Sequence, residues 1–178
     1  NFGFDLDTEM ERRGPESLIA DHPVTNLARI DPDGSVHLAS PGMHFPNGSV
    51  VTPDGKTLVV AETFANVLTA FDIDAAGGLS NRRVWAAMGE RTPDGICLDQ
   101  AGGIWVASFM TSDFVRVTEG GAVTDLIPVP GKAAVTCQLG GDDGRTLFLS
   151  TYAGTIEDLH QQQAAGAIEV QVRQDDHL

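Results

Sequence analysis

Apolar and polar residues alternate over short stretches along most of the chain, and turns rich in Gly, Pro and Asp separate these stretches. Alternation with a period of two is typical of β-strands that bury one face. The pattern predicts strands from residue 25 to residue 173. Residues 5–24 are polar and show no sustained period, so we expect a long loop there. The chain is therefore predicted to be all-β.

Two stretches of the chain resemble each other. Residues 47–62 read NGSVVTPDGKTLVVAE, and residues 94–108 read DGICLDQAGGIWVAS. They open on Asn47-Gly48 and Asp94-Gly95, which lie 47 positions apart. A repeat of about 40–50 residues that contains only strands indicates a β-propeller with one blade per repeat. The first strand of each blade lines a central channel, so polar residues at this place in successive blades are expected to converge.

The repeats predict how the chain is divided. We expect a single partial β-propeller domain over 1–178, made of a long loop at 5–24, a half blade at 25–40, complete blades at 47–88 and 94–130, and a partial blade at 135–173. Closed propellers usually contain about four to eight blades. We therefore interpret the chain as the C-terminal fragment of a longer protein, with an intact short β domain as the alternative.

The charge of the chain limits its partners. Lys and Arg number 11 against 25 Asp and Glu, which gives a net charge of −14. Nucleic acids and anionic membranes are disfavoured, because both attract basic surfaces. No apolar run is long enough to span a membrane, and Cys97 and Cys137 lie among apolar neighbours, as buried thiols do. We expect a cytoplasmic protein, although a chain that begins at Asn1 does not reveal whether a signal peptide precedes it.

Residues 24–152 resemble the senescence marker protein/regucalcin/gluconolactonase family. The resemblance rests on the order and spacing of Asn47-Gly48 before Pro53-Asp54-Gly55, Leu79-Ser80-Asn81-Arg82-Arg83, Pro93-Asp94-Gly95 before Asp99, and Cys137-Gln138-Leu139-Gly140-Gly141. It implies a six-bladed propeller that holds one divalent cation in its central channel. It also implies hydrolysis of sugar lactones, and some relatives act on phosphotriesters.

The same resemblance suggests a candidate site. Asn47 and Asp94 match two of the family's metal ligands, and Asp94 is also implied as the catalytic general base. The third ligand, a Glu, and the Arg and Asn that hold the sugar are expected upstream of Asn1. Amide and carboxylate oxygens suit calcium, our first expectation, as well as magnesium, manganese or zinc. The alternative is that Asn47 and Asp94 are only turn residues that precede strands.

Other polar residues are weaker candidates. Thr136 lies near the corresponding place in the next blade and is a candidate for substrate binding, as is Glu9 if the loop at 5–24 covers the channel mouth. Glu62 and Asp99 close strands, and we interpret them as a solvated strand end and a turn residue. No cofactor other than the cation is expected.

The sequence leaves three functions open. The first is metal-dependent hydrolysis of a sugar lactone such as gluconolactone by the parent protein, with the isolated fragment inactive. The second is hydrolysis of an organophosphate or another ester on the same site. The third is a non-catalytic propeller that binds a ligand or a protein, because one fold hosts many functions. The paired oxygens of Asn47 and Asp94 favour an enzyme with a small-molecule substrate. The sequence does not specify the lactone or the oligomeric state.

Overall fold

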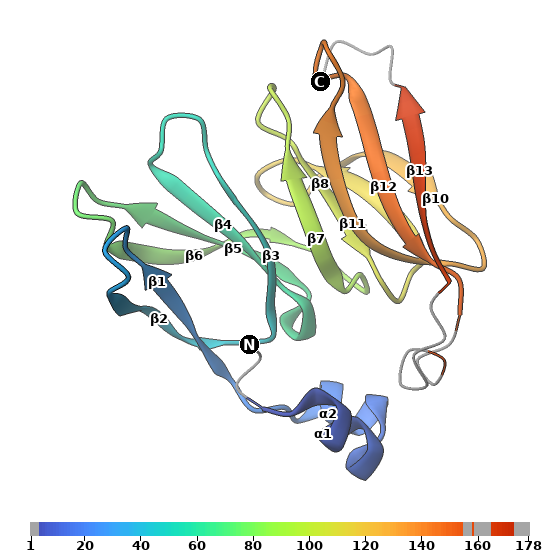
Figure 1. Ribbon diagram of the computed structural model, residues 1–178, viewed down its shortest axis with the longest axis horizontal. Coiled ribbons are helices and arrows are strands. Elements are labelled where there is room, and N and C mark those ends of the chain that lie inside the picture. Colours follow the sequence, from blue (N-terminus) through green and yellow to red (C-terminus); the bar gives the residue numbers. More distant parts are fainter. Residues whose placement is uncertain (1–3, 155–157, 159–164, 173–178) are drawn as a thin grey trace.

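The computed structural model describes residues 4–154, 158 and 165–172. Over this part of the chain the strands form four antiparallel sheets that lie side by side in chain order, above two short helices (Figure 1). The predicted all-β class is therefore confirmed.

Each sheet is built from strands that follow one another in the sequence, so every connection within a sheet is a hairpin. The first sheet contains β1 (Thr25–Ile30) and β2 (Val36–Met43). The second contains β3 (Pro46–Val51), β4 (Thr57–Glu62), β5 (Val67–Ile73) and β6 (Leu79–Ala87). The third contains β7 (Pro93–Leu98), β8 (Ile104–Ser108), β9 (Asp113–Val117) and β10 (Val123–Pro128). The fourth contains β11 (Ala133–Gly140), β12 (Thr146–Tyr152) and β13 (Gly166–Val172).

Hydrophobic layers fill the spaces between neighbouring sheets. The β3–β6 sheet packs on the β7–β10 sheet through Val59, Leu68, Trp85, Ile104 and Val115, among others. The β7–β10 sheet packs on the β11–β13 sheet through Trp105, Phe114, Leu147 and Leu149 with both cysteines. A smaller cluster of Met43, Val60 and Phe71 joins the first two sheets. The two central sheets therefore bury both faces, whereas an isolated antiparallel sheet commonly exposes one.

The first strands of successive sheets lie next to one another. β3 contacts β7, and β7 contacts β11. Strand register pairs Pro46 with Glu62 and Pro93 with Ser108, so the starts of β3 and β7 and the turns after β4 and β8 gather at one end of the sheets. The two helices lie at this same end (Figure 1).

The segment at 5–24, expected as a loop, contains helices α1 (Leu6–Arg13) and α2 (Pro15–Ala20). The Asp5 side chain caps α1 by accepting a hydrogen bond from the backbone N–H of Thr8 at 3.1 Å. Glu9 then forms ion pairs with Arg12 and Arg13 one turn later, which stabilises so polar a helix. The expectation was wrong because α1 follows local capping and charge pairing rather than a hydrophobic period. Neither helix in the described ranges is long and apolar enough to cross a membrane.

Glu62 is a buried charge rather than the solvated strand end expected from the sequence. Its side chain is 1% exposed and pairs with Arg82 of β6 at 3.0 Å. Its carboxylate also accepts hydrogen bonds from the backbone N–H of His44 at 2.7 Å and from the Thr69 hydroxyl at 2.5 Å. Arg82 donates further to the carbonyl oxygens of Pro41 and Gly42. This network ties β4, β5 and β6 to the chain that enters β3.

Asp99 is a turn residue, as expected. Its carboxylate accepts hydrogen bonds from the backbone N–H groups of Ala101 and Gly103, both at 2.9 Å. It also forms a fully buried ion pair with Arg116 at 2.6 Å. The two cysteines are buried free thiols whose Sγ atoms lie 3.6 Å apart across β7 and β11. The sequence predicts their burial but not their contact.

Arg82 and Arg83 offer a matched test of pairing with a buried carboxylate, Glu62, against pairing with a partly exposed one, Asp72. Arg82→Met leaves the buried Glu62 carboxylate without its cation, so we expect the free energy of unfolding to fall by about 3 kcal/mol. Arg83→Met removes the pair with Asp72, in which both side chains are partly exposed, and a hydrogen bond to the carbonyl oxygen of Asn81, and it is expected to cost less than about 1 kcal/mol. Urea unfolding of both variants measures the difference. Equal losses would contradict a special role for the Glu62 network.

Candidate functional site

The Asn-Gly and Asp-Gly dipeptides both lie in β-bulges at the start of an inner strand. Pro46 pairs with Glu62 and Ser49 with Val60, so three steps along β3 face two along β4. Pro93 pairs with Ser108 and Ile96 with Val106, which repeats the same bulge in β7. A bulge re-aims the side chain that it contains and is common beside active sites. The bulges therefore place Asn47 and Asp94 in equivalent positions.

Glycine at the second position of each dipeptide lets the inner strands approach closely. A Cβ atom on Gly48 would lie 2.6 Å from the backbone N of Ile96 and 2.7 Å from the carbonyl oxygen of Asp94. A Cβ atom on Gly95 would overlap the Thr136 side chain. These positions exclude any side chain, because non-bonded heavy atoms do not approach this closely. The glycines therefore determine how near Asn47 comes to Asp94.

Asn47 and Asp94 are brought together. The Asn47 side chain is exposed, whereas Asp94 is half-buried and lies within interaction distance of the Asn47 amide. Burial raises the pKa of Asp94 to about 6 from the usual 3.8, and the interaction with the Asn47 amide offsets only part of this effect. The Asp94 carboxylate is therefore poorly compensated as an anion, which is the electrostatic condition that favours a nearby cation.

The pair provides a neutral and an anionic oxygen for a hard cation. Among the residues that the structure describes, no group of three or more His, Cys, Asp or Glu side chains surrounds this position. Two protein oxygens leave most coordination positions of a calcium ion to water, to substrate or to other ligands.

Thr136 and Glu9, the other candidates, lie differently. β11 has its own irregularity between Ala134 and Thr136, which makes Val135 the equivalent of Asn47 and Asp94. Thr136 instead occupies the position of the glycines and packs against Gly95. Glu9 lies on α1 and directs its carboxylate to Arg12 and Arg13. In the part of the chain that the structure describes, neither residue hydrogen-bonds to Asn47 or Asp94, and their roles in substrate binding stay predictions.

A short 3-10 turn, η1 (Thr63–Ala65), contributes residues that the sequence did not single out. The Thr63 hydroxyl donates to the carbonyl oxygen of Pro93 at 2.7 Å, and Asn47 Nδ2 lies 3.5 Å from the same hydroxyl. Thr63 directly follows Glu62, and no motif marks it. Only the pairing of β4 with β3 brings it beside Asn47.

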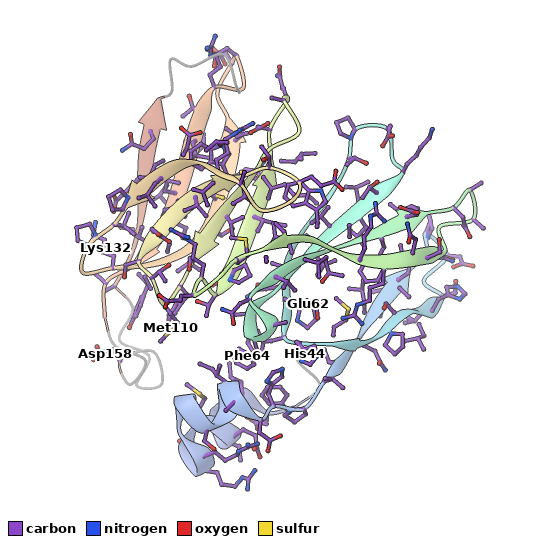
Figure 2. All side chains as sticks on the ribbon, turned by 180° about the vertical axis from the view of Figure 1, so that it is seen from behind. His44, Glu62, Phe64, Met110, Lys132 and Asp158 are labelled. Atoms are coloured by element: carbon purple, nitrogen blue, oxygen red, sulfur yellow. The ribbon has the colours of Figure 1, made fainter. Side chains whose placement is uncertain are left out.

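Aromatic side chains surround the same end of the sheets. Phe64 stacks on Phe45 with their ring centroids 4.4 Å apart. His22, which follows α2, contacts the Phe64 ring edge and hydrogen-bonds to His44 through ring nitrogens 2.9 Å apart. In Figure 2, His44 and Phe64 lie between the sheets and the helices. The histidine contact joins α2 to the chain that enters β3.

Comparison with known proteins places this geometry in context. Residues 6–153 match the family model described as the SMP-30/Gluconolactonase/LRE-like region. The chain is 34% identical over 146 residues to regucalcin from Danio rerio, covering 79% of this chain and 50% of that protein. It is 29% identical over 131 residues to a pentonolactonase from Haloferax volcanii, covering 72% and 45% of the two chains.

A solved structure has the same fold. A calcium-binding protein, regucalcin, from Agrobacterium tumefaciens superposes with a TM-score of 0.68 at 23% identity, covering 83% of this chain and 52% of that one. The chain spans about half the length of the curated relatives that it matches. The family match extends from α1 to the end of β12 and includes both dipeptides of the candidate site. The chain therefore belongs to the SMP-30/Gluconolactonase/LRE-like family.

Proposed function

We propose that the whole protein is a divalent-cation-dependent hydrolase of a sugar lactone, with Asn47 and Asp94 as two of its metal ligands. The observation that carries the proposal is the contact between these two side chains at equivalent bulges of neighbouring inner strands. A pair of turn residues needs only local hydrogen bonds, whereas this pair meets across two sheets.

The relatives support the chemical class. The lactonase from Haloferax volcanii is named for a sugar lactone, and the regucalcin structure from Agrobacterium tumefaciens is described as calcium-binding. We therefore propose calcium as the cation and a small aldonolactone as the substrate. Oxygen ligands from an amide and a carboxylate agree with this choice of a hard cation.

The proposed chemistry divides between the cation and Asp94. A bound cation polarises the lactone carbonyl and lowers the pKa of a coordinated water. Asp94 accepts a proton from the attacking water as the new bond to the carbonyl carbon forms. The bond between that carbon and the ring oxygen then breaks, and the proton passes to the ring oxygen to give the open hydroxy acid. The pKa of about 6 belongs to Asp94 without a cation, and a bound cation would lower it, so the carboxylate would be ionised at neutral pH and able to accept a proton.

We also propose that the sheets are blades of a six-bladed propeller. The outer face of the first sheet exposes Ile30, Val36 and Leu38, and the fourth sheet exposes Ile168 and Val170. Each set lies on one face of its sheet, since Ile30 pairs with Val36 and Ile168 and Val170 are two residues apart. Large exposed apolar rows of this kind are typical of surfaces that pack against another element.

Substitution of the two proposed ligands tests the function. In the whole protein, Asp94→Ala is expected to lower kcat/KM for gluconolactone at least about a hundredfold, because it removes both a ligand and the general base. Asn47→Ala is expected to weaken calcium binding, measured by isothermal titration calorimetry. Asp72→Ala, a change at an exposed carboxylate of β5, serves as the control and is expected to leave both quantities unchanged.

The outcome distinguishes the remaining functions. Activity that is lost in chelator and restored by calcium supports the lactonase. Turnover of a phosphotriester or another ester in preference to any lactone would favour the second hydrolase reading. A folded protein that binds calcium through Asp94 but hydrolyses none of these substrates would favour a binding module.

The raised pKa of Asp94 predicts how stability depends on pH in chelator. The folded chain binds more protons than the unfolded chain between about pH 4 and about pH 6, because the folded pKa is the higher one. The free energy of unfolding is therefore expected to fall by about 3 kcal/mol as the pH rises through this window. Urea unfolding gives the free energy of unfolding of the protein and of Asp94→Asn at each pH, and the difference between the two plots against pH isolates this contribution. Parallel plots would contradict it.

A further inference from the structure

The Thr63 side chain links the two proposed ligand positions through one oxygen atom. Thr63 is 8% exposed and opens η1, directly after β4. Its hydroxyl donates to the carbonyl oxygen of Pro93, the residue before Asp94, at 2.7 Å. The same oxygen lies 3.5 Å from the amide nitrogen of Asn47. A residue from outside both inner strands therefore contacts the ligand side chain of β3 and the backbone that carries the ligand of β7.

The number of hydrogens on this hydroxyl determines the orientation of the Asn47 amide. A threonine hydroxyl has one hydrogen and accepts through its lone pairs. Because Pro93 receives that hydrogen, Asn47 meets the Thr63 oxygen as a donor, through Nδ2. The reversed amide would place two acceptors against each other. Thr63 thus turns the Asn47 Nδ2 toward η1 and leaves Oδ1, the atom that a cation needs, directed away from it.

We propose that Thr63 is a positioning residue for the cation site. It holds Nδ2 of the Asn47 amide and fixes the peptide next to Asp94, so that Asn47 Oδ1 stays available to a cation beside Asp94. This inference rests on the proposed function, since it assigns Thr63 a role at the same site. Partners of metal ligands act in this way in many metalloproteins, and their loss typically weakens metal affinity about 10–100-fold.

The attachment of η1 does not depend on the Thr63 hydroxyl alone. The backbone N–H of Thr63 donates to the carbonyl oxygen of Phe45 at 3.1 Å. Asn66, which follows the turn, donates from its side chain to the carbonyl oxygen of Arg91 at 2.6 Å. These bonds hold the turn to β3 and to the chain that enters β7. Removing the hydroxyl is therefore expected to free the Asn47 amide while the turn remains in place.

The test compares Thr63→Val with Thr63→Ser in the whole protein. Valine has nearly the shape of threonine but no hydroxyl, so we expect the calcium Kd to rise about 10–100-fold by isothermal titration calorimetry. Serine keeps the hydroxyl and is expected to restore the Kd to within about threefold of the original value, a range smaller than the loss expected for valine. In chelator, the side-chain amide resonances of Asn47 in an NMR spectrum are expected to shift in Thr63→Val and to remain in Thr63→Ser.

Thr69→Val is the matched control for a general loss of stability. Thr69 is 3% exposed in the same sheet, and its hydroxyl donates to Glu62 rather than to either proposed ligand. We expect Thr69→Val to destabilise the fold and to leave the calcium Kd unchanged. Equal weakening of calcium binding by both valine variants would overturn the positioning role, as would an unchanged Kd in Thr63→Val or no rescue by serine.

Failure of this inference is distinct from failure of the proposed function. If Asn47→Ala and Asp94→Ala weaken calcium binding but Thr63→Val does not, only the positioning role is overturned. If neither ligand substitution changes the calcium Kd, the proposed metal site fails, and the inference fails with it.

Discussion

The absence of side chains at Gly48 and Gly95 is the constraint on which the candidate site depends. β3 and β7 meet backbone to backbone at Gly48, and β7 meets the Thr136 side chain of β11 at Gly95. Larger residues at these points would separate the sheets, and the layers of Val, Leu, Ile and Trp between them would lose contacts. The same close approach brings Asn47 to Asp94. Core packing and candidate chemistry therefore share one geometric requirement.

Buried charge provides a second level of order around the site. The Glu62 carboxylate accepts hydrogen bonds from His44, Thr69 and Arg82. It therefore joins β6, the edge strand of its sheet, to the chain that enters the inner strand β3. Burying a carboxylate costs free energy unless all its partners are present. The Glu62 side chain is therefore stable only when β4, β5 and β6 pack in this one arrangement. Thr63 follows Glu62 directly, but its own bonds to the carbonyl oxygens of Phe45 and Pro93 hold it near Asn47.

The sequence predicts the features that local patterns encode. Alternating apolar residues predict the antiparallel sheets, and the repeated Asn-Gly and Asp-Gly dipeptides predict that Asn47 and Asp94 are equivalent. The α1 helix was missed because its stability comes from the Asp5 cap and the Glu9 ion pairs rather than from an apolar face. The burial of Glu62 and the place of Thr63 depend on partners from other strands. No pattern around either residue carries that information.

The hairpin connectivity of the sheets has a consequence for how the molecule moves. Every strand pairs with its neighbour in the sequence, so hydrogen bonding within a sheet does not depend on the next sheet. Modular proteins of this kind resemble a one-dimensional array, in which stability is the sum of unit terms and nearest-neighbour interface terms. Asn47 and Asp94 lie on opposite sides of one such interface. If the two sheets separated briefly, the pair would come apart while each hairpin stayed intact, so the pair depends on the docking of one sheet against the next.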